Sequence, residues 1–163
     1  MTFIGIITNK NNEKIFENDL KGNLEDKINL IFINNENIQN IRNVAFEALL
    51  LCYDYKKVFE NIEYLRKVVS NSKKFIVNTD VESNYDILNS LNVDAITYGF
   101  NAKATVTASS IEEDVILCIQ RNIISLNNSI IEPQDIKIKE KYNLVNIYET
   151  LGISVLLLLY SKK

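Results

Sequence analysis

Two aspartates that follow apolar runs are the residues best placed to do chemistry. Asp54 comes shortly after the run Phe46–Cys52, and Asp80 comes shortly after Phe75–Val77. Since the carboxyl ends of parallel strands meet at one edge of a sheet, their carboxylates are expected at a common rim. Such a pair can hold Mg²⁺ through water or act as acid and base. The commoner role is capping, with Asp54 before a helix at residue 56 and Asp80 before one at residue 83.

Missing residue types exclude several kinds of active site. The chain contains no histidine, which removes Ser-His-Asp and Cys-His nucleophiles and His-ligated zinc or haem. The two cysteines, Cys52 and Cys118, are far apart and each lies in an apolar run. They are predicted to be buried, inert thiols, so no metal site is expected.

The overall composition is that of one globular domain. The chain has 163 residues, of which 47% are hydrophobic and 24% charged, and its net charge is −3. The charge gives no basic surface for nucleic acid. The longest strongly apolar run, Ile153–Tyr160, is too short to span a bilayer, and the N-terminal residues do not resemble a signal peptide. We therefore expect a single domain over residues 1–163, a cytoplasmic location and no membrane contact.

The elements that position these residues alternate between strands and helices. The first third of the chain is predicted to form strands at Phe3–Thr8, Ile28–Ile33 and Phe46–Cys52. A helix over residues 56–69, a strand at Phe75–Val77, a short helix opened by a capping box at Ser83–Asp86 and a strand at Asp94–Tyr98 follow. This order predicts parallel pairing with right-handed crossovers.

The pattern changes after Gly99. Short runs at Ala104–Ser109, Val115–Ile119, Ile123–Leu126 and Ile136–Ile138 predict a meander, and Asn143–Tyr160 predicts a helix weakened near Gly152. The expected fold class is α/β, with a mostly parallel Rossmann-like sheet flanked by helices and an antiparallel β meander in the C-terminal half.

The order of these motifs resembles the central ATP-binding domain of the Mur ligases, which join amino acids to peptidoglycan precursors. The likeness covers about residues 46–153. It lies in the segments Phe75–Asp80, Ala95–Phe100, Asn101–Ala104, Tyr142–Asn146 and Leu151–Gly152.

The resemblance implies a nucleotide site at a few positions. Asn146 matches the asparagine that contacts adenine in that family, and Asn143 opens the same segment. Asn78 and Asp80 match a turn beside the nucleotide. Without the resemblance, Asn143 and Asn146 are ordinary helix-start residues, and Asn78 and Asp80 form an N-cap or an Asx-turn.

The chain also departs from that family. It has no Gly-x-x-x-x-Gly-Lys-Ser/Thr loop to hold ATP phosphates, and its four glycines are isolated. The family's metal-binding Glu and His, its modified Lys and its C-terminal ligase domain have no counterpart. These departures predict a reduced relative that is not an enzyme and needs no cofactor.

Three functions remain open. The favoured one is a non-catalytic binding or protein-interaction module linked to cell-wall processes, whose exposed sheet edges pair with a second copy or with an unknown protein partner. An alternative is a nucleotide or small-ligand binder that keeps an adenine pocket near Asn146 for ATP or ADP. The other alternative is an enzyme of another class that uses Asp54 and Asp80.

Overall fold

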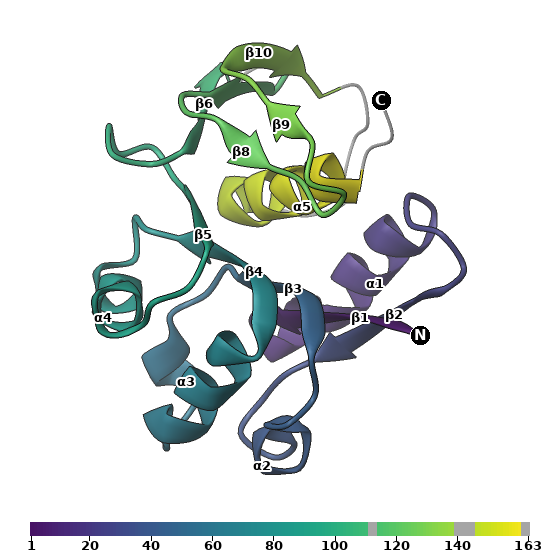
Figure 1. The fold of residues 1–163 in the computed structure, drawn as a ribbon, viewed down its shortest axis with the longest axis vertical. Helices are drawn as coiled ribbons and strands as arrows, with labels where there is room; N and C mark the ends of the chain where they lie inside the picture. Colours follow the sequence, from purple (N-terminus) through teal and green to yellow (C-terminus); the bar gives the residue numbers. More distant parts are fainter. Residues whose placement is uncertain (111–113, 139–145, 161–163) are drawn as a thin grey trace.

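The computed structural model describes residues 1–110, 114–138 and 146–160. Its main feature is an eight-stranded sheet with the order β10-β7-β6-β5-β4-β3-β1-β2 (Figure 1). The strands of this sheet are β1 Thr2–Ile7, β2 Ile28–Phe32, β3 Phe46–Leu51, β4 Ser72–Asn78, β5 Ala95–Tyr98, β6 Val106–Ser110, β7 Ile116–Ile119 and β10 Gln134–Lys137. A separate two-stranded hairpin consists of β8 Ile123–Ile124 and β9 Ile130–Ile131.

The predicted α/β architecture is confirmed. Strands β2, β1, β3, β4 and β5 pair in parallel, as expected for near-continuous apolar runs joined by crossovers. The antiparallel part consists of β6, β7 and β10. Strand β6 itself joins β5 in parallel, with Tyr98 opposite Val106, so the antiparallel region begins one strand later than predicted.

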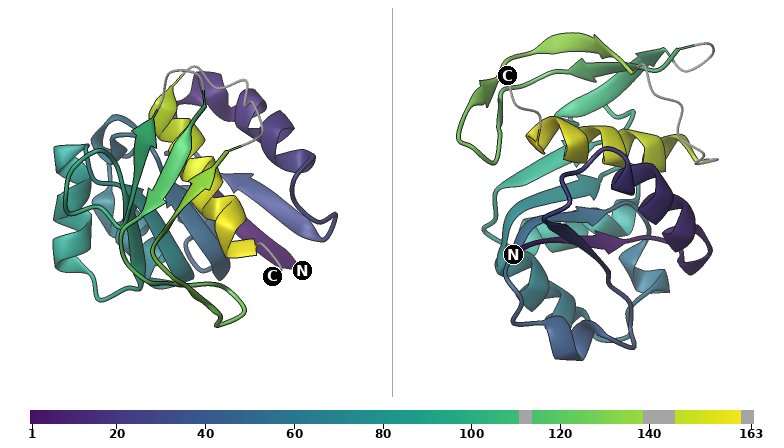
Figure 2. Two further views of the ribbon diagram at one scale, coloured as in Figure 1. Left: turned by 90° about the horizontal axis from the view of Figure 1, so that it is seen from above. Right: turned by 90° about the vertical axis from the view of Figure 1, so that its right-hand side faces the viewer.

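Helices cover both faces of the sheet. The helices are α1 Glu13–Lys21, α2 Ile38–Ile41, α3 Ile62–Ser70, α4 Glu82–Ser90 and α5 Ile147–Tyr160. Residues of α1 and α5 belong to one apolar cluster, and residues of α2, α3 and α4 belong to the other. Figure 2 shows α1 and α5 on the same side of the parallel strands. The core is therefore divided in two by the sheet.

Helix α5 lies between two parts of the same sheet. Strands β6, β7 and β10 curl over it, while β3 and β4 lie beneath it (Figures 1 and 2). Most of its residues are buried, which explains why it is apolar all around instead of on one stripe.

The N-terminal third differs from the prediction of strands alone. Helix α1 follows β1, and it buries Phe16 and Leu20 one turn apart. The helix expected to begin at residue 56 starts instead at Ile62, after a 3-10 turn over Tyr55–Lys57. Asn61 ends the intervening segment because its side chain caps α3 by accepting a hydrogen bond from the Glu63 N–H at 2.9 Å.

Two other expectations need correction. Helix α4 forms, but Ser83 does not cap it: the N-cap is Val81, and the Ser83 hydroxyl donates to Asp54. Helix α5 continues through Gly152 without a break. The predicted start of that helix at Asn143 lies outside the described residues.

Within the described ranges, none of the helices combines the length and the apolar character that crossing a bilayer requires.

Candidate functional site

The first turn of α5 meets three loops at the carboxyl ends of the parallel strands. Tyr148 contacts the loops that follow β4 and β5, and the adjacent Glu149 contacts the loop that follows β1. This is the edge where open α/β sheets bind ligands.

Asp80 accepts hydrogen bonds from the loop after β5. The Phe100 N–H donates to its Oδ2 at 2.7 Å, and the Asn101 N–H donates to its Oδ1 at 3.2 Å. The Asn101 side-chain amide donates to the same Oδ1 at 2.7 Å and to Thr79 Oγ1 at 3.0 Å. The loop after β5 thus encloses the Asp80 carboxylate.

Gly99 makes this arrangement possible. Its φ is +150°, a backbone conformation that side chains disfavour, and a Cβ at this position would lie 2.5 Å from Asp80 Oδ1. Only glycine allows the backbone to pass so close to the carboxylate.

Tyr148 completes the surroundings of Asp80. Its ring packs edge-on against Phe100 with 5.5 Å between centroids, and its hydroxyl donates a hydrogen bond to Asp80. Partial burial raises the pKa of Asp80, but the hydrogen bonds from Phe100, Asn101 and Tyr148 outweigh it and lower the pKa below its ordinary value. Asp80 is therefore held as a carboxylate.

The asparagines singled out from the sequence have structural partners. The buried Asn78 accepts the Asp80 N–H at 3.0 Å, which is an Asx-turn. Asn146 is exposed and accepts the Tyr148 N–H at 2.9 Å at the start of α5. The structure brings Asp80 and Asn78 into one turn and places Asn146 two residues before Tyr148. Asn143 lies outside the described residues.

Asp54 and Asp80 belong to different hydrogen-bond networks. Asp54 Oδ1 accepts the Lys56 N–H at 3.0 Å and the Ser83 hydroxyl at 2.6 Å. It caps the 3-10 turn after β3, as the capping interpretation predicts. That interpretation is wrong for Asp80, because α4 begins after Val81 without any side-chain cap. Asp80 instead binds backbone twenty residues further along the chain.

Glu149 occupies the loop between β1 and α1, and nothing in the sequence singles it out. Its Oε1 accepts the Asn12 amide at 2.6 Å and the Thr8 hydroxyl at 3.2 Å. Asn12 is the N-cap residue of α1. A buried carboxylate, 3% exposed, therefore lies against the N-terminal end of the first helix after β1.

Burial controls the charge of Glu149. The loss of solvent raises its pKa above the ordinary value, and the hydrogen bonds from Asn12 and Thr8 only partly oppose this. The neighbouring Cys52 is also buried, which raises its pKa to about 12 and keeps the thiol protonated. Cys118, predicted to be buried, is only half-buried.

A polar hollow of about 280 Å³ opens beside this loop, at the carboxyl ends of β1, β2 and β3. Its walls carry charges of both signs, including Lys10 and Glu36, whose charged atoms lie 3.9 Å apart. In the described part of the chain, no three His, Cys, Asp or Glu side chains gather as metal ligands would.

No family model matches the chain, and no curated protein matches it either.

Proposed function

We propose that this chain is a non-catalytic protein-binding module, related to the central domain of the Mur ligases, whose phosphate position is filled by its own carboxylate. The observation that carries the proposal is the contact of Glu149 with Thr8 and Asn12 at the start of α1.

The proposal follows from how helix N-termini bind phosphate. A phosphate-binding loop after the first strand presents free backbone N–H groups, usually next to glycine, to an anion at the start of the next helix. Here the loop Thr8–Asn12 contains no glycine and is folded as a 3-10 turn, which Asn9 caps by accepting the Asn11 N–H at 3.1 Å. The Glu149 carboxylate already lies beside this loop. When ionised, it would repel a phosphate at close range.

The aspartates support the same conclusion. A general base needs a pKa near the working pH and a free oxygen directed at the substrate. The hydrogen bonds around Asp80 lower its pKa, and its oxygens accept bonds from Phe100, Asn101 and Tyr148. Asp54 caps a turn. These roles favour binding over an enzyme that uses the two aspartates as a pair.

The tie to the Mur ligases, and through them to cell-wall processes, rests on the order of the motifs between residues 46 and 153. The partner we infer is a protein, because the sheet ends in two edge strands, β10 and β2, and the Glu149 carboxylate lies beside the loop after β1.

Thermal unfolding with nucleotides tests the proposal. A ligand present at 100 times its Kd would stabilise the fold by about 2.7 kcal/mol, which is easily measured. We expect no change in midpoint with millimolar ATP or ADP, with or without Mg²⁺. A nucleotide-dependent rise in the wild type would contradict the proposal and favour the adenine-pocket alternative.

A variant shows whether the carboxylate is what excludes phosphate. Glu149→Gln keeps an acceptor for Thr8 and Asn12 but removes the charge, and Glu60→Gln removes a charge at an exposed position. We expect millimolar ATP to raise the midpoint of Glu149→Gln only. If Glu149→Gln does not respond, the loop backbone alone excludes the phosphate.

A further inference from the structure

The two edges of the sheet differ in how they are protected. The edge strand β10 is flanked by Pro133 and carries the exposed charges Asp135 and Lys137, which discourage pairing with another chain. The opposite edge strand, β2, has the sequence Ile-Asn-Leu-Ile-Phe, with no charge and no proline. Of the two edge strands of this sheet, β2 thus lacks the charges and proline that usually prevent pairing with another chain.

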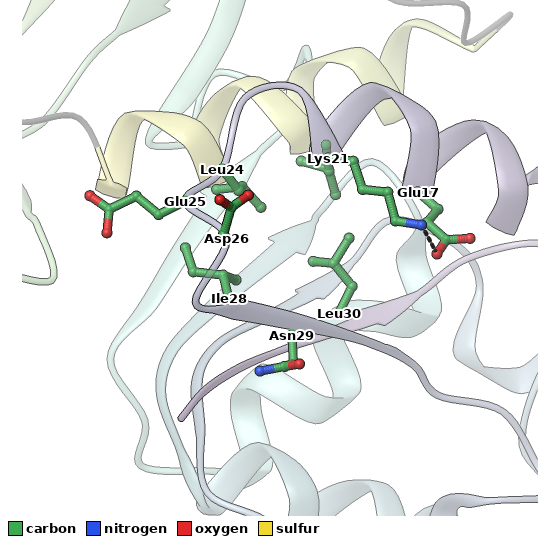
Figure 3. Close-up of a pocket in the computed structure, with 9 residues that line it drawn as sticks. Glu17, Lys21, Leu24, Glu25, Asp26, Ile28, Asn29 and Leu30 are labelled. Atoms are coloured by element: carbon green, nitrogen blue, oxygen red, sulfur yellow. Dashed lines mark ion pairs between the residues drawn. The ribbon is translucent and has the colours of Figure 1, made fainter.

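A groove with an apolar floor and a charged rim runs along β2 on the side of α1, and Glu17, Lys21, Glu25 and Asp26 are among its lining residues. Figure 3 shows Ile28 and Leu30 directed toward α1, and Asn29 directed away from it. Together with Leu24, these side chains line a groove of about 480 Å³. Ile28 and Leu30 are only half-buried, so they have apolar surface left for a partner.

The outward backbone groups of β2 are partly used at its two ends. The Ile33 N–H bonds to Ile6 of β1 at 2.8 Å, so by the alternation of a parallel strand, residues 28, 30 and 32 direct their N–H and C=O groups away from β1. The Ile28 N–H donates to Glu25 O at 3.0 Å, and Phe32 O accepts the Asn37 amide at 2.7 Å. The Leu30 N–H and C=O, the Ile28 C=O and the Phe32 N–H still face outward.

We propose that a second copy of this chain pairs with β2, antiparallel and about a twofold axis through Leu30. The proposal deepens the proposed function, because it names the protein partner as another copy. It extends the sheet continuously across two molecules.

The remaining backbone groups are self-complementary under this symmetry. Leu30 faces its own counterpart, so each donates its N–H to the C=O of the other. Phe32 faces Ile28 of the other copy, and its N–H reaches the outward Ile28 C=O. The two groups already satisfied within the chain, the Ile28 N–H and the Phe32 C=O, also face one another. The axis thus matches free donors with free acceptors.

The charges on α1 fit the same axis. Glu17 and Lys21 form an ion pair of 2.6 Å on the rim of the groove, and both side chains are substantially exposed (Figure 3). Twofold symmetry sets the two α1 helices antiparallel beside each other. Glu17 of one copy then faces Lys21 of the other, so the rims attract each other.

Sedimentation velocity of the full chain over a range of micromolar concentrations tests the pairing. We expect a dimer for the wild type and at least about a tenfold weaker association for Leu30→Lys, because a charge at the centre of an edge strand opposes pairing. Ile124→Lys is the matched control, since Ile124 is also a half-exposed aliphatic residue on a strand, but on β8. It should associate like the wild type.

A charge swap tests the twofold geometry without touching the strand. Lys21→Glu places like charges across the axis and should weaken the dimer, whereas the double variant Glu17→Lys/Lys21→Glu should restore it. The swap also restores the ion pair within α1, so the stability of each variant must be compared with its association. Thermal unfolding of each variant confirms that it is folded.

The results can overturn the inference. A wild type that is monomeric throughout, or a dimer that Ile124→Lys breaks and Leu30→Lys does not, excludes pairing at β2. If Leu30→Lys does not fold, the charge swap decides instead. A dimer that Lys21→Glu weakens and that Glu17→Lys/Lys21→Glu does not restore also excludes this pairing at β2. The nucleotide measurements do not depend on dimer formation, so a negative result for the dimer does not contradict the proposed function.

Discussion

Two carboxylates that meet the same turn of α5 have pKa values shifted in opposite directions. Asp80 accepts two backbone N–H groups and the Tyr148 hydroxyl, and its pKa is lowered. Glu149 is buried, and its pKa is raised because the loss of solvent outweighs two side-chain hydrogen bonds. Tyr148 thus contacts a carboxylate that stabilises the fold when charged, and the adjacent Glu149 carries one that costs stability when charged.

The raised pKa of Glu149 predicts a pH-dependent loss of stability. Between the ordinary pKa near 4.5 and the raised folded value, the folded state binds more protons than the unfolded state, so stability falls as the pH rises through this window. We expect Glu149→Gln to lack this loss and to be more stable than the wild type at neutral pH. Urea unfolding of both proteins from pH 4 to pH 8 measures the free energy of unfolding at each pH.

Glu60→Gln is the control, because this exposed side chain should leave the profile unchanged. Asp80 contributes in the opposite sense, losing stability as the pH falls, but it is present in all three proteins. Equal stabilities of Glu149→Gln and the wild type at every pH would show that burial does not penalise the Glu149 charge.

A second prediction concerns Gly99. Gly99→Ala forces a Cβ to within 2.5 Å of Asp80 Oδ1 at a positive φ, so we expect a loss of about 1–3 kcal/mol in the free energy of unfolding. Gly22→Ala is the matched control, since Gly22 has an ordinary backbone conformation and open space around it. It should be neutral or gain about 0.4–1 kcal/mol. Similar urea midpoints for the two variants would contradict the close approach.

Sequence reasoning found Asp80 but not its partners. A carboxylate just before a helix is usually a cap, and nothing local indicates that the loop at Phe100–Asn101 folds back on it. Glu149 was missed for the same reason, since its partner Thr8 lies 141 residues away in the sequence. Contacts of this range depend on how the sheet and α5 pack, which no motif encodes.

At the scale of elements, the predictions were right where burial produces a continuous apolar run. The strands β1 to β5 are such runs, and their parallel order follows from the crossovers. Helix α1 was missed because it buries only Phe16 and Leu20 among its apolar residues, within a segment rich in Asn and Lys. The strand β9, with two residues, is too short to show a period.

Helix α5 continues through Gly152 because the glycine makes room for a neighbour. A Cβ there would lie 2.9 Å from the Tyr98 hydroxyl and 3.0 Å from Leu50 Cδ1. An intrinsic preference of about 1 kcal/mol for Ala over Gly in a helix is therefore overridden by packing. The prediction of a helix weakened near Gly152 took account of the low helix propensity of glycine but not of this packing.

This packing predicts a coupled pair of substitutions. Gly152→Ala should destabilise by about 1–3 kcal/mol through overpacking, despite the better helix former. Tyr98→Phe should be neutral or stabilising, because the buried hydroxyl has no hydrogen-bond partner among the described residues. In the double variant, part of the loss should be recovered, and urea unfolding of all four proteins measures the coupling. Strictly additive effects would exclude the contact.

At the scale of the whole molecule, α5 joins the two parts of the sheet. It packs against β3 and β4 on one side and against β6 on the other. We expect a single cooperative unfolding transition, with equal calorimetric and van't Hoff enthalpies. Leu156→Ala, in the buried middle of α5, should lower that one midpoint by removing about 2–5 kcal/mol. Two separate transitions would mean that the strands after β5 form a domain of their own.

The position of α5 in the sequence has a consequence for biosynthesis. Every strand leaves the ribosome before the helix that they enclose, so the nascent chain carries two uncovered apolar surfaces until residues 147–160 have been added. Native structure in this part of the protein is therefore expected to form only after α5 has left the ribosome, and the incomplete chain is a natural client for a chaperone that shields apolar surface.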